Sequence, residues 1–140
     1  MTQKIKVGVL CVFCSICANA MEIDLQGIWR LEHADDPGVT CPVRIPGGNY
    51  AALIDAGIIP DPYRARNEHL VQWPRTKDWI FTRTFEVPED FARRREIVLR
   101  LEGVDLFATV RLNGVEVGRT RDRFLRYDFD VKYVLRQGGK

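Results

Sequence analysis

Two groups of residues in this sequence have types and spacings that could do chemistry. Cys11, Cys14 and Cys17 follow the C-x₂-C-x₂-C spacing of thiolates that bind an iron–sulfur cluster. They lie inside an apolar run and lack a fourth cysteine followed by proline, so we expect no metal site there. The second group lies in and just after the irregular stretch 63–77, which is too long for a simple connection and is therefore a candidate functional loop.

Several common chemistries lack the residues that they need. Ser15 is the only serine and lies in the same apolar run, which excludes a Ser-His-Asp triad in the rest of the chain. The two histidines, His33 and His69, have no second ligand at metal-binding spacing. No glycine-rich phosphate loop follows a strand pattern. The sequence therefore predicts no metal and no cofactor.

The first twenty residues have the three-part pattern of a secretory signal peptide. Lys4 and Lys6 form the charged start, residues 7–17 the apolar core, and Ala18-Asn19-Ala20 a small-x-small cleavage site. We expect residues 1–20 to be a signal peptide and residues 21–140 to be an exported domain, in a secreted, periplasmic or lysosome-like location. No membrane association is expected after cleavage. The alternative is that this segment is a buried N-terminal strand.

Charge and cysteine content limit the partners of the expected domain. The chain has 21 basic and 19 acidic residues, and two of the basic residues lie in the predicted signal, so the remainder is electrically neutral. This balance does not favour binding to nucleic acid. Cys41 is the only cysteine after position 20, so no internal disulfide can form and the domain depends on its apolar core.

The elements that must position the loop have the period of β-strands. Asn113-Gly114 predicts a type I′ hairpin turn, because both central residues of that turn need a positive φ. Side chains alternate across strands, so one face collects the apolar residues of the hairpin. The expected cross-strand pairs are Leu112 with Val115, Arg111 with Glu116, and Val110 with Val117, and the expected apolar face holds Ala108, Val110, Leu112, Val115 and Val117.

Further strands are expected at 27–32, 39–45, 79–87, 97–102 and 125–131. Pro42 confines the second of them to a sheet edge or a bulge. A helix of about two turns is expected over 50–56, with Asn49 as its N-cap and Gly57 as its C′ residue. Six or seven short strands with one short helix predict an all-β sandwich.

A series of ordered stretches resembles the N-terminal domain of glycoside hydrolase family 2, in its β-mannosidase-like branch. They are IPGG at 45–48, LIDAGIIPDPY at 53–63, RNE at 66–68, VQW at 71–73, DW at 78–79, FTRTFEVP at 81–88 and LEGVDLFATVRLNGVEVGRT at 101–120. The resemblance covers residues 27–140. It implies a galactose-binding-domain-like jelly roll that helps to build one wall of a sugar pocket. In such enzymes an immunoglobulin-like domain and a catalytic (β/α)₈ barrel follow.

The resemblance also implies an activity and a partner. The parent enzyme would hydrolyse terminal β-linked mannose with retention, so its partners would be β-mannoside-containing glycans. The family's domain continues with further strands, so this chain is expected to lack the last strands of the jelly roll and the barrel, and to be inactive alone. The alternatives are a free-standing carbohydrate-binding module and an inactive gene fragment.

The candidate sugar-facing or barrel-facing residues come from the same resemblance. They are Asn67, Glu68, Trp73, Asp78, Trp79 and Arg83. The two tryptophans could stack on a sugar ring or pack in the core, and periodicity favours the core for Trp79 while leaving Trp73 open. Asp78 could accept a hydrogen bond from a hydroxyl or merely cap a turn.

The remaining candidates are weighed against simpler interpretations. Retaining hydrolysis needs two carboxyl groups about 5–5.5 Å apart, and Glu68 has no partner of that kind, so no catalytic residue is predicted. Asn67 and Glu68 face a neighbouring domain or the pocket rim, or are simply solvated. Arg83 shares the face of buried aromatic residues and needs a partner if buried, for which Asp105 or Glu102 is the candidate.

Overall fold

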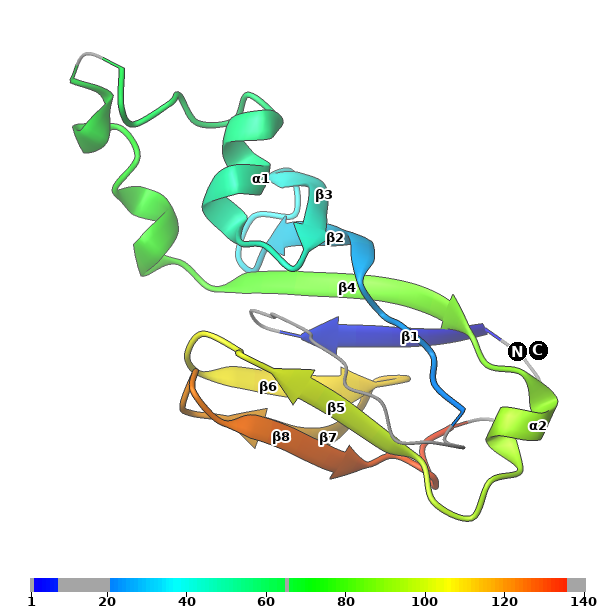
Figure 1. The fold of residues 1–140 in the computed structure, drawn as a ribbon. Coiled ribbons are helices and arrows are strands. Elements are labelled where there is room, and N and C mark those ends of the chain that lie inside the picture. The colour runs from blue at the N-terminus through cyan, green and yellow to red at the C-terminus, as the bar shows by residue number, and fades with distance from the viewer. Residues whose placement is uncertain (1, 8–20, 65, 136–140) are drawn as a thin grey trace.

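Antiparallel strands make up most of the regular structure in the computed structural model, which describes residues 2–7, 21–64 and 66–135 of the chain (Figure 1). In chain order the elements are β1 (Thr2–Val7), β2 (Gly27–His33), β3 (Thr40–Ile45), α1 (Asn49–Asp55), the 3₁₀-helices η1 (Asn67–His69) and η2 (Trp73–Thr76), β4 (Trp79–Glu86), α2 (Glu89–Ala92), β5 (Val98–Glu102), β6 (Ala108–Leu112), β7 (Val115–Thr120) and β8 (Arg126–Asp130).

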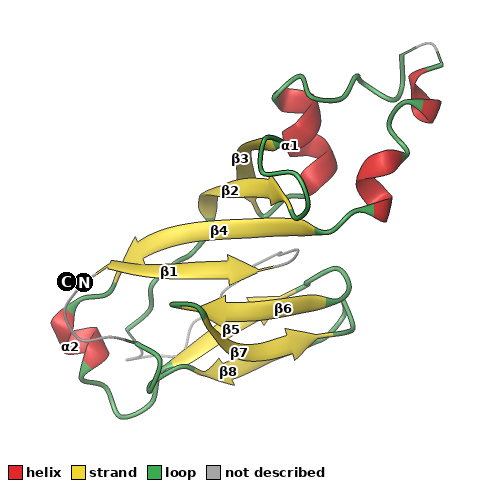
Figure 2. Cartoon of the chain, turned by 180° about the vertical axis from the view of Figure 1, so that it is seen from behind, coloured by secondary structure: helices red, strands yellow, loops and turns green. Residues whose placement is uncertain are grey.

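The strands form two antiparallel sheets. The larger has the order β3-β2-β4-β1-β6-β7, and the smaller pairs β5 with β8. Seen from both sides, the β5–β8 pair lies against the β6–β7 end of the large sheet, whereas α1 lies at the β2–β3 end (Figures 1 and 2). This arrangement confirms the predicted all-β sandwich, and its core extends from under α1 to the β5–β8 pair.

The core follows the predicted alternation of apolar residues. Trp29 and Leu31 of β2 and Phe81 of β4 point inward and are fully buried, while Ile28 and Arg30 point to solvent. The largest fully buried side chains are Trp29, Phe81, Leu31, Ile45, Leu53, Leu101, Leu112 and Val43. Because they come from both sheets and from α1, burial of apolar surface is what joins these layers.

The β6–β7 hairpin has the predicted turn but only part of the predicted register. Asn113 and Gly114 have φ of 50° and 83°, as a type I′ turn requires. Leu112 lies opposite Val115, and Arg111 lies opposite Glu116, as expected. The third pair is wrong, because a β-bulge between Val110 and Arg111 places Val110 opposite Gly118.

The bulge brings a glycine beneath an aromatic ring of the other sheet. A Cβ on Gly118 would overlap the ring of Phe129 on β8, so only glycine lets this ring pack at that position. The expected apolar face is also incomplete, because Val115 is half exposed on the edge strand β7. The register therefore depends on packing between the sheets, which the turn sequence does not encode.

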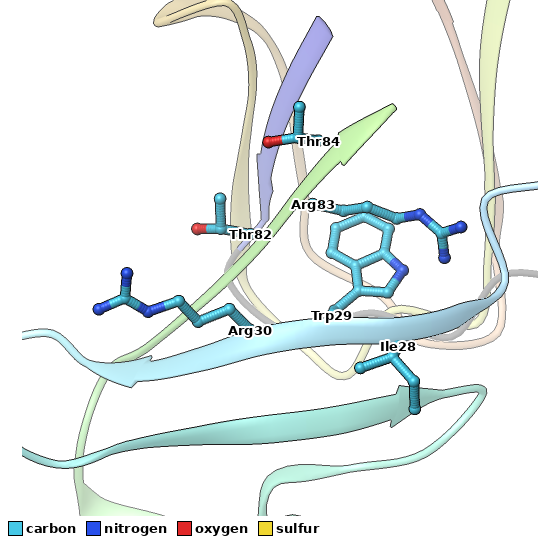
Figure 3. A pocket seen from close by; sticks show the side chains of 6 residues that line it. All are labelled: Ile28, Trp29, Arg30, Thr82, Arg83 and Thr84. Carbon is cyan, nitrogen blue, oxygen red and sulfur yellow. The ribbon is translucent and has the colours of Figure 1, made fainter. Parts of the chain in front are cut away.

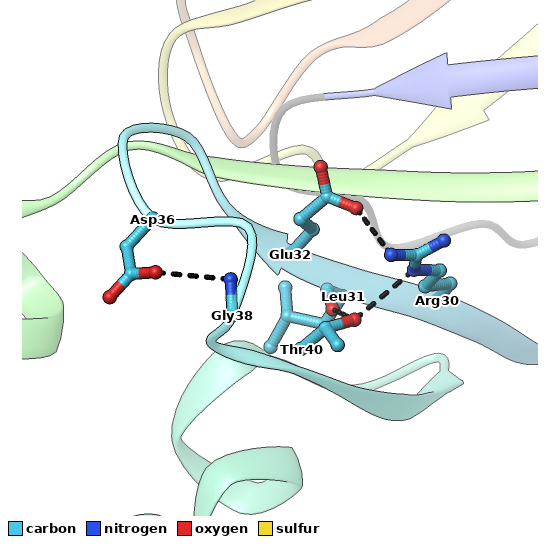
Figure 4. Close-up of polar contacts among 6 residues, drawn as sticks. All are labelled: Arg30, Leu31, Glu32, Asp36, Gly38 and Thr40. Carbon is cyan, nitrogen blue, oxygen red and sulfur yellow. Dashed lines mark hydrogen bonds and ion pairs between the residues drawn. The ribbon is translucent and has the colours of Figure 1, made fainter.

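Polar contacts hold the β2–β3 hairpin together (Figure 4). The Gly38 backbone N–H donates to Asp36 Oδ1 at 3.0 Å, which closes the turn. Thr40 Oγ1 donates to the Leu31 carbonyl at 2.8 Å and accepts from Arg30 Nε at 3.1 Å. β3 is an edge strand, as predicted from the presence of Pro42.

The helices differ in part from the prediction. Helix α1 begins at Asn49, so the predicted cap residue lies inside the helix and Gly48 is the N-cap. Asn49 Oδ1 accepts instead from the backbone N–H of Tyr50 at 2.9 Å. Gly57 follows the C-cap with φ of 68°, as predicted for C′. The sequence predicted one short helix, whereas the described residues include a second, α2, and two 3₁₀-helices.

The N-terminal strand β1 lies within the large sheet, between β4 and β6. Its position is the one expected if the N-terminal segment is a strand, which was the alternative to a signal peptide. Cys11, Cys14, Cys17 and Ser15 lie outside the described residues, and so does the expected cleavage site. Removal of residues 1–20 stays a prediction. In the described part of the chain, no helix has the length and apolar character to cross a membrane.

Candidate functional site

The long segment between α1 and β4 is an ordered loop anchored to its surroundings. Tyr50 Oη on α1 donates to the Val71 carbonyl at 2.9 Å, which fixes the middle of the loop. The side-chain amide of Asn67 donates to the Asp61 carbonyl at 3.0 Å and closes the turn around η1. Val71 is buried, so the loop contributes to the core as well as to the surface. Such anchoring holds the exposed side chains of the loop in fixed positions.

Three aromatic rings meet where this loop enters β4. The ring centroids of Trp73 and Trp79 lie 5.8 Å apart with an interplanar angle of 39°. His33, at the end of β2, lies 5.3 Å from Trp79 in an edge-to-face arrangement and 6.2 Å from Trp73. His33 and Trp79 are direct partners in the β2–β4 register, so strand pairing alone brings these two residues together. We call His33, Trp73 and Trp79 the aromatic cluster.

Hydrogen bonds fix each buried member of the aromatic cluster. Trp79 Nε1 donates to the Pro74 carbonyl at 2.8 Å. His33 Nδ1 accepts from the backbone N–H groups of Asp35 at 3.1 Å and Asp36 at 3.0 Å. The Trp79 bond therefore holds the end of the loop, and the His33 bonds hold the turn after β2. Since these polar atoms already have partners inside the protein, they do not need a ligand.

The two tryptophans differ in what they could offer a ligand. Trp79 is 5% exposed, which confirms the prediction that it packs in the core. Trp73 is only partly buried and packs on the other two rings of the aromatic cluster. A partly exposed indole on a rigid aromatic base can stack on the apolar face of a sugar ring.

The polar candidates of the loop lie in two places. Asp78 directly precedes Trp79, its side chain is exposed, and its carbonyl accepts from the Ala34 N–H at 2.9 Å. Glu68 lies on η1 with its side chain 70% exposed and 3.6 Å from His69 Nε2. The structure therefore brings Asp78 next to the aromatic cluster and places Asn67 and Glu68 on a separate turn of the same loop.

The prediction that Arg83 pairs with Asp105 or Glu102 is wrong. Its Nη1 donates to the Leu25 carbonyl at 3.0 Å and to the Gln26 carbonyl, whereas the Asp105 carboxylate lies 3.9 Å from Arg123. Arg83 also lies four residues from Trp79 along β4, about 13 Å for an extended strand. Its role in the structure is to hold the segment that leads into β2.

Arg83 borders an open depression of about 380 Å³ on the β2–β4 surface (Figure 3). The lining residues are Ile28, Trp29, Arg30, Thr82, Arg83 and Thr84. In Figure 3 the guanidinium groups of Arg30 and Arg83 point away from each other. The guanidinium of Arg83 already donates hydrogen bonds to backbone carbonyls. The polar groups of this depression therefore do not converge on one point where a ligand could bind.

The pKa shifts of the described acidic and thiol groups arise from ion pairs and burial outside the loop. The guanidinium of Arg100 lowers the pKa of Asp128, and that of Arg119 lowers the pKa of Glu116. Burial raises the pKa of the Cys41 thiol. These groups lie on β8, β7 and β3 rather than on the loop. Among the described residues, no group of three or more His, Cys, Asp or Glu could hold a metal ion.

His33 is the site residue that the sequence reasoning missed. It was considered only as a metal ligand, although it continues the inward register of Trp29 and Leu31 along β2. That register placed it on the buried face, where a histidine needs partners for its ring nitrogens. The turn after β2 supplies two backbone N–H donors, and β4 supplies the tryptophan.

The fold is that of a galactose-binding-like β-sandwich domain. A sequence model of the family described as glycosyl hydrolase 2 galactose-binding domain-like matches residues 29–140, so the chain belongs to this family. The structure of a β-D-mannosidase from Dictyoglomus thermophilum is similar, with a TM-score of 0.79 and 35% sequence identity. That similarity covers 84% of this chain and 14% of the solved one.

The relatives similar in sequence are much longer than this chain. A β-mannosidase of Bos taurus is 31% identical over 118 residues, which are 84% of this chain and 13% of that protein. β-Mannosidase B of Thermothelomyces thermophilus is 34% identical over 124 residues, which are 87% of this chain and 14% of that protein. The chain thus spans about one seventh of the length of these relatives.

Proposed function

We propose that this chain is the N-terminal sugar-binding-type domain of an exported β-mannosidase-like glycoside hydrolase. The parent enzyme hydrolyses terminal β-linked mannose with retention, and its substrates are β-mannoside-containing glycans. The observation that carries the proposal is the similarity to β-mannosidases over 84% of the chain, at 31% identity in sequence and at a TM-score of 0.79 in structure. Export is supported by the three-part pattern of residues 1–20.

In this proposal the chain forms part of the pocket rim and leaves the bond cleavage to another domain. Retaining hydrolysis needs two carboxyl groups about 5–5.5 Å apart. The loop offers instead the partly exposed indole of Trp73 and the exposed carboxylate of Asp78, next to the buried Trp79. An aromatic face and a carboxylate that accepts hydroxyl hydrogens suit the orientation of a sugar ring rather than its hydrolysis.

The activity is tested with 4-nitrophenyl β-D-mannopyranoside and the whole reading frame that contains this chain. We expect the complete polypeptide to release 4-nitrophenol, and to do so far more slowly from the α-mannoside and the β-glucoside. The 140-residue chain alone should release none. A complete polypeptide that is folded but inactive on the β-mannoside would refute the proposal, and measurable mannoside binding by the chain alone in calorimetry would favour a free-standing binding module.

The role of the loop is tested by replacing one exposed carboxylate in the complete polypeptide. Asp78→Ala should lower kcat/KM about ten- to hundredfold, the loss expected for a hydrogen bond to a charged group. Asp35→Ala is the matched control, because Asp35 is an exposed carboxylate on the neighbouring β2–β3 turn. It should change kcat/KM less than about twofold. Equal effects of the two substitutions would remove Asp78 from the pocket rim.

A further inference from the structure

Strand β4 depends on two different partners along its length. Strand β2 pairs with residues Trp79 to Thr82, and β1 pairs with residues Phe81 to Glu86. Among the described residues, the second half of β4, from Arg83 onward, therefore has β1 as its only strand partner. Without β1, this stretch would present unpaired backbone N–H and C=O groups along an open edge.

Strand β6 has the same relation to β1. It pairs with β7 along one edge, and its residues Val110 to Leu112 pair with β1 along the other. Lys6 lies opposite both Thr82 of β4 and Arg111 of β6, and Ile5 lies opposite both Arg83 and Leu112. Within the part of the chain that the structure describes, β1 is thus the single strand that joins a β3-β2-β4 half to a β6-β7 half of the large sheet.

From this register we propose that the facing edges of β4 and β6 form a slot that binds one extended polypeptide segment, antiparallel to both strands, and that Thr2–Val7 is its occupant in this chain. We call it the strand slot. Its recognition rests on main-chain hydrogen bonds on two sides, as in complexes where a peptide adds a strand to a sheet. The two edges belong to β4 and β6, which start at residues 79 and 108, so the segment that fills the slot comes from a distant part of the chain.

The occupant of the strand slot is also the start of the predicted signal peptide. Removal of residues 1–20, which the proposed export entails, would open both edges at once. The strand slot does not rest on the proposed activity, because it concerns pairing of the sheet rather than the loop.

A proline scan of the 140-residue chain tests the strand slot. Ile5→Pro removes a backbone N–H at a position that lies between both neighbours, whereas Thr2→Pro changes the end of the strand, opposite Glu86. We expect Ile5→Pro to accelerate amide hydrogen exchange at residues 83–86 and 110–112 at least about tenfold, and Thr2→Pro to change it less than about threefold. Amides of β5 and β8, which pair only with each other, report whether the chain remains folded.

A measurement on the unsubstituted chain keeps the test independent of how the proline variants fold. Backbone NOEs between Lys6 and Thr82, and between Lys6 and Arg111, are expected if β1 lies in the strand slot. Their absence from a folded chain would overturn the proposal. Equal exchange at residues 83–86 in the two proline variants, with β5 and β8 still protected, would overturn it as well.

Discussion

His33 shows how one residue holds the candidate site together. Its ring packs edge-to-face on Trp79 at 5.3 Å, and its Nδ1 accepts two backbone N–H groups from the turn after β2. The residue is 6% exposed, so water cannot easily replace it as the acceptor. The position of the loop relative to the sheet therefore depends on this side chain as much as on the tryptophans.

The first prediction compares the two histidines. His33→Ala should lower the free energy of unfolding by about 2–4 kcal/mol, because it leaves a cavity and two unsatisfied N–H groups. His69→Ala is the control, since that side chain is 77% exposed and its Nε2 lies 3.6 Å from the carboxylate of Glu68, which is itself 70% exposed. It should cost less than about 0.5 kcal/mol. Urea unfolding monitored by tryptophan fluorescence measures both, and similar costs would contradict the role of His33.

Gly118 is a second residue whose type is set by its neighbour. A Cβ at this position would overlap the Phe129 ring, which stacks on Tyr127 at a centroid distance of 6.1 Å. We predict that Gly118→Ala lowers the free energy of unfolding by about 1–3 kcal/mol, because the ring must leave its place. In a Phe129→Ala background the same change should cost less than about 0.5 kcal/mol. Additive costs in the double-mutant cycle, measured by urea unfolding, would show that the ring is not the cause.

At the scale of elements, a charged pair joins the two strands of the small β5–β8 sheet. Arg100 and Asp128 are register partners, and the guanidinium donates to both carboxylate oxygens at 2.8 and 3.0 Å. This pairing lowers the pKa of Asp128 below its usual value of 3.8. A carboxyl group whose pKa is lower in the folded state stabilises the fold when it is ionised.

The pH dependence of stability follows from that sign. The contribution of Asp128 is complete above the pKa of the unfolded chain, about 4, and is lost as the pH falls through the lower pKa of the folded state. Asp128→Asn should therefore destabilise the chain by up to about 1 kcal/mol at pH 7, because the carboxylate is 38% exposed and partly screened. The difference from the unsubstituted chain should shrink as the pH falls below about 4.

Urea unfolding at a series of pH values measures this difference. Asp35→Asn is the matched control, because Asp35 is an exposed carboxylate that lies between β2 and β3, outside the β5–β8 sheet. Its cost should be small at every pH of the series. A cost of Asp128→Asn that stays constant from pH 7 to below 4 would show that lost packing, rather than charge pairing, is responsible.

At the scale of the whole molecule, the proposed export requires residues 1–20 to be removed. The proposed export predicts that the chain released by a secreting host begins at Met21, after the Ala18-Asn19-Ala20 site. Ala20→Arg should block this processing, because the site requires a small residue, whereas Ala51→Arg on the exposed face of α1 should leave it unchanged. N-terminal sequencing of the released protein checks both. A released chain that still begins at residue 1 or 2 would refute the cleavage.

Prediction from the sequence succeeded where local rules decide the outcome. The Asn113-Gly114 turn follows from its need for positive φ, and the inward pattern of Trp29 and Leu31 follows from alternation along a strand. Prediction failed where contacts between residues that are far apart in the sequence determine the local structure. The bulge before Arg111 places Val110 opposite Gly118, on which the Phe129 ring of the other sheet packs, and the partners of Arg83 lie in the segment that precedes β2.

Patterns along the chain are enough to predict the class of fold, most strand positions, the family and the loop in which candidate site residues lie. These features rest on periodicity, turn residues and ordered motifs, all of which are local along the chain. The packing of His33 on Trp73 and Trp79, and the position of Thr2–Val7 between β4 and β6, became visible only in the folded chain. The physical reason is that ring packing and strand pairing join residues that are far apart in sequence, so local propensity cannot specify which partners meet.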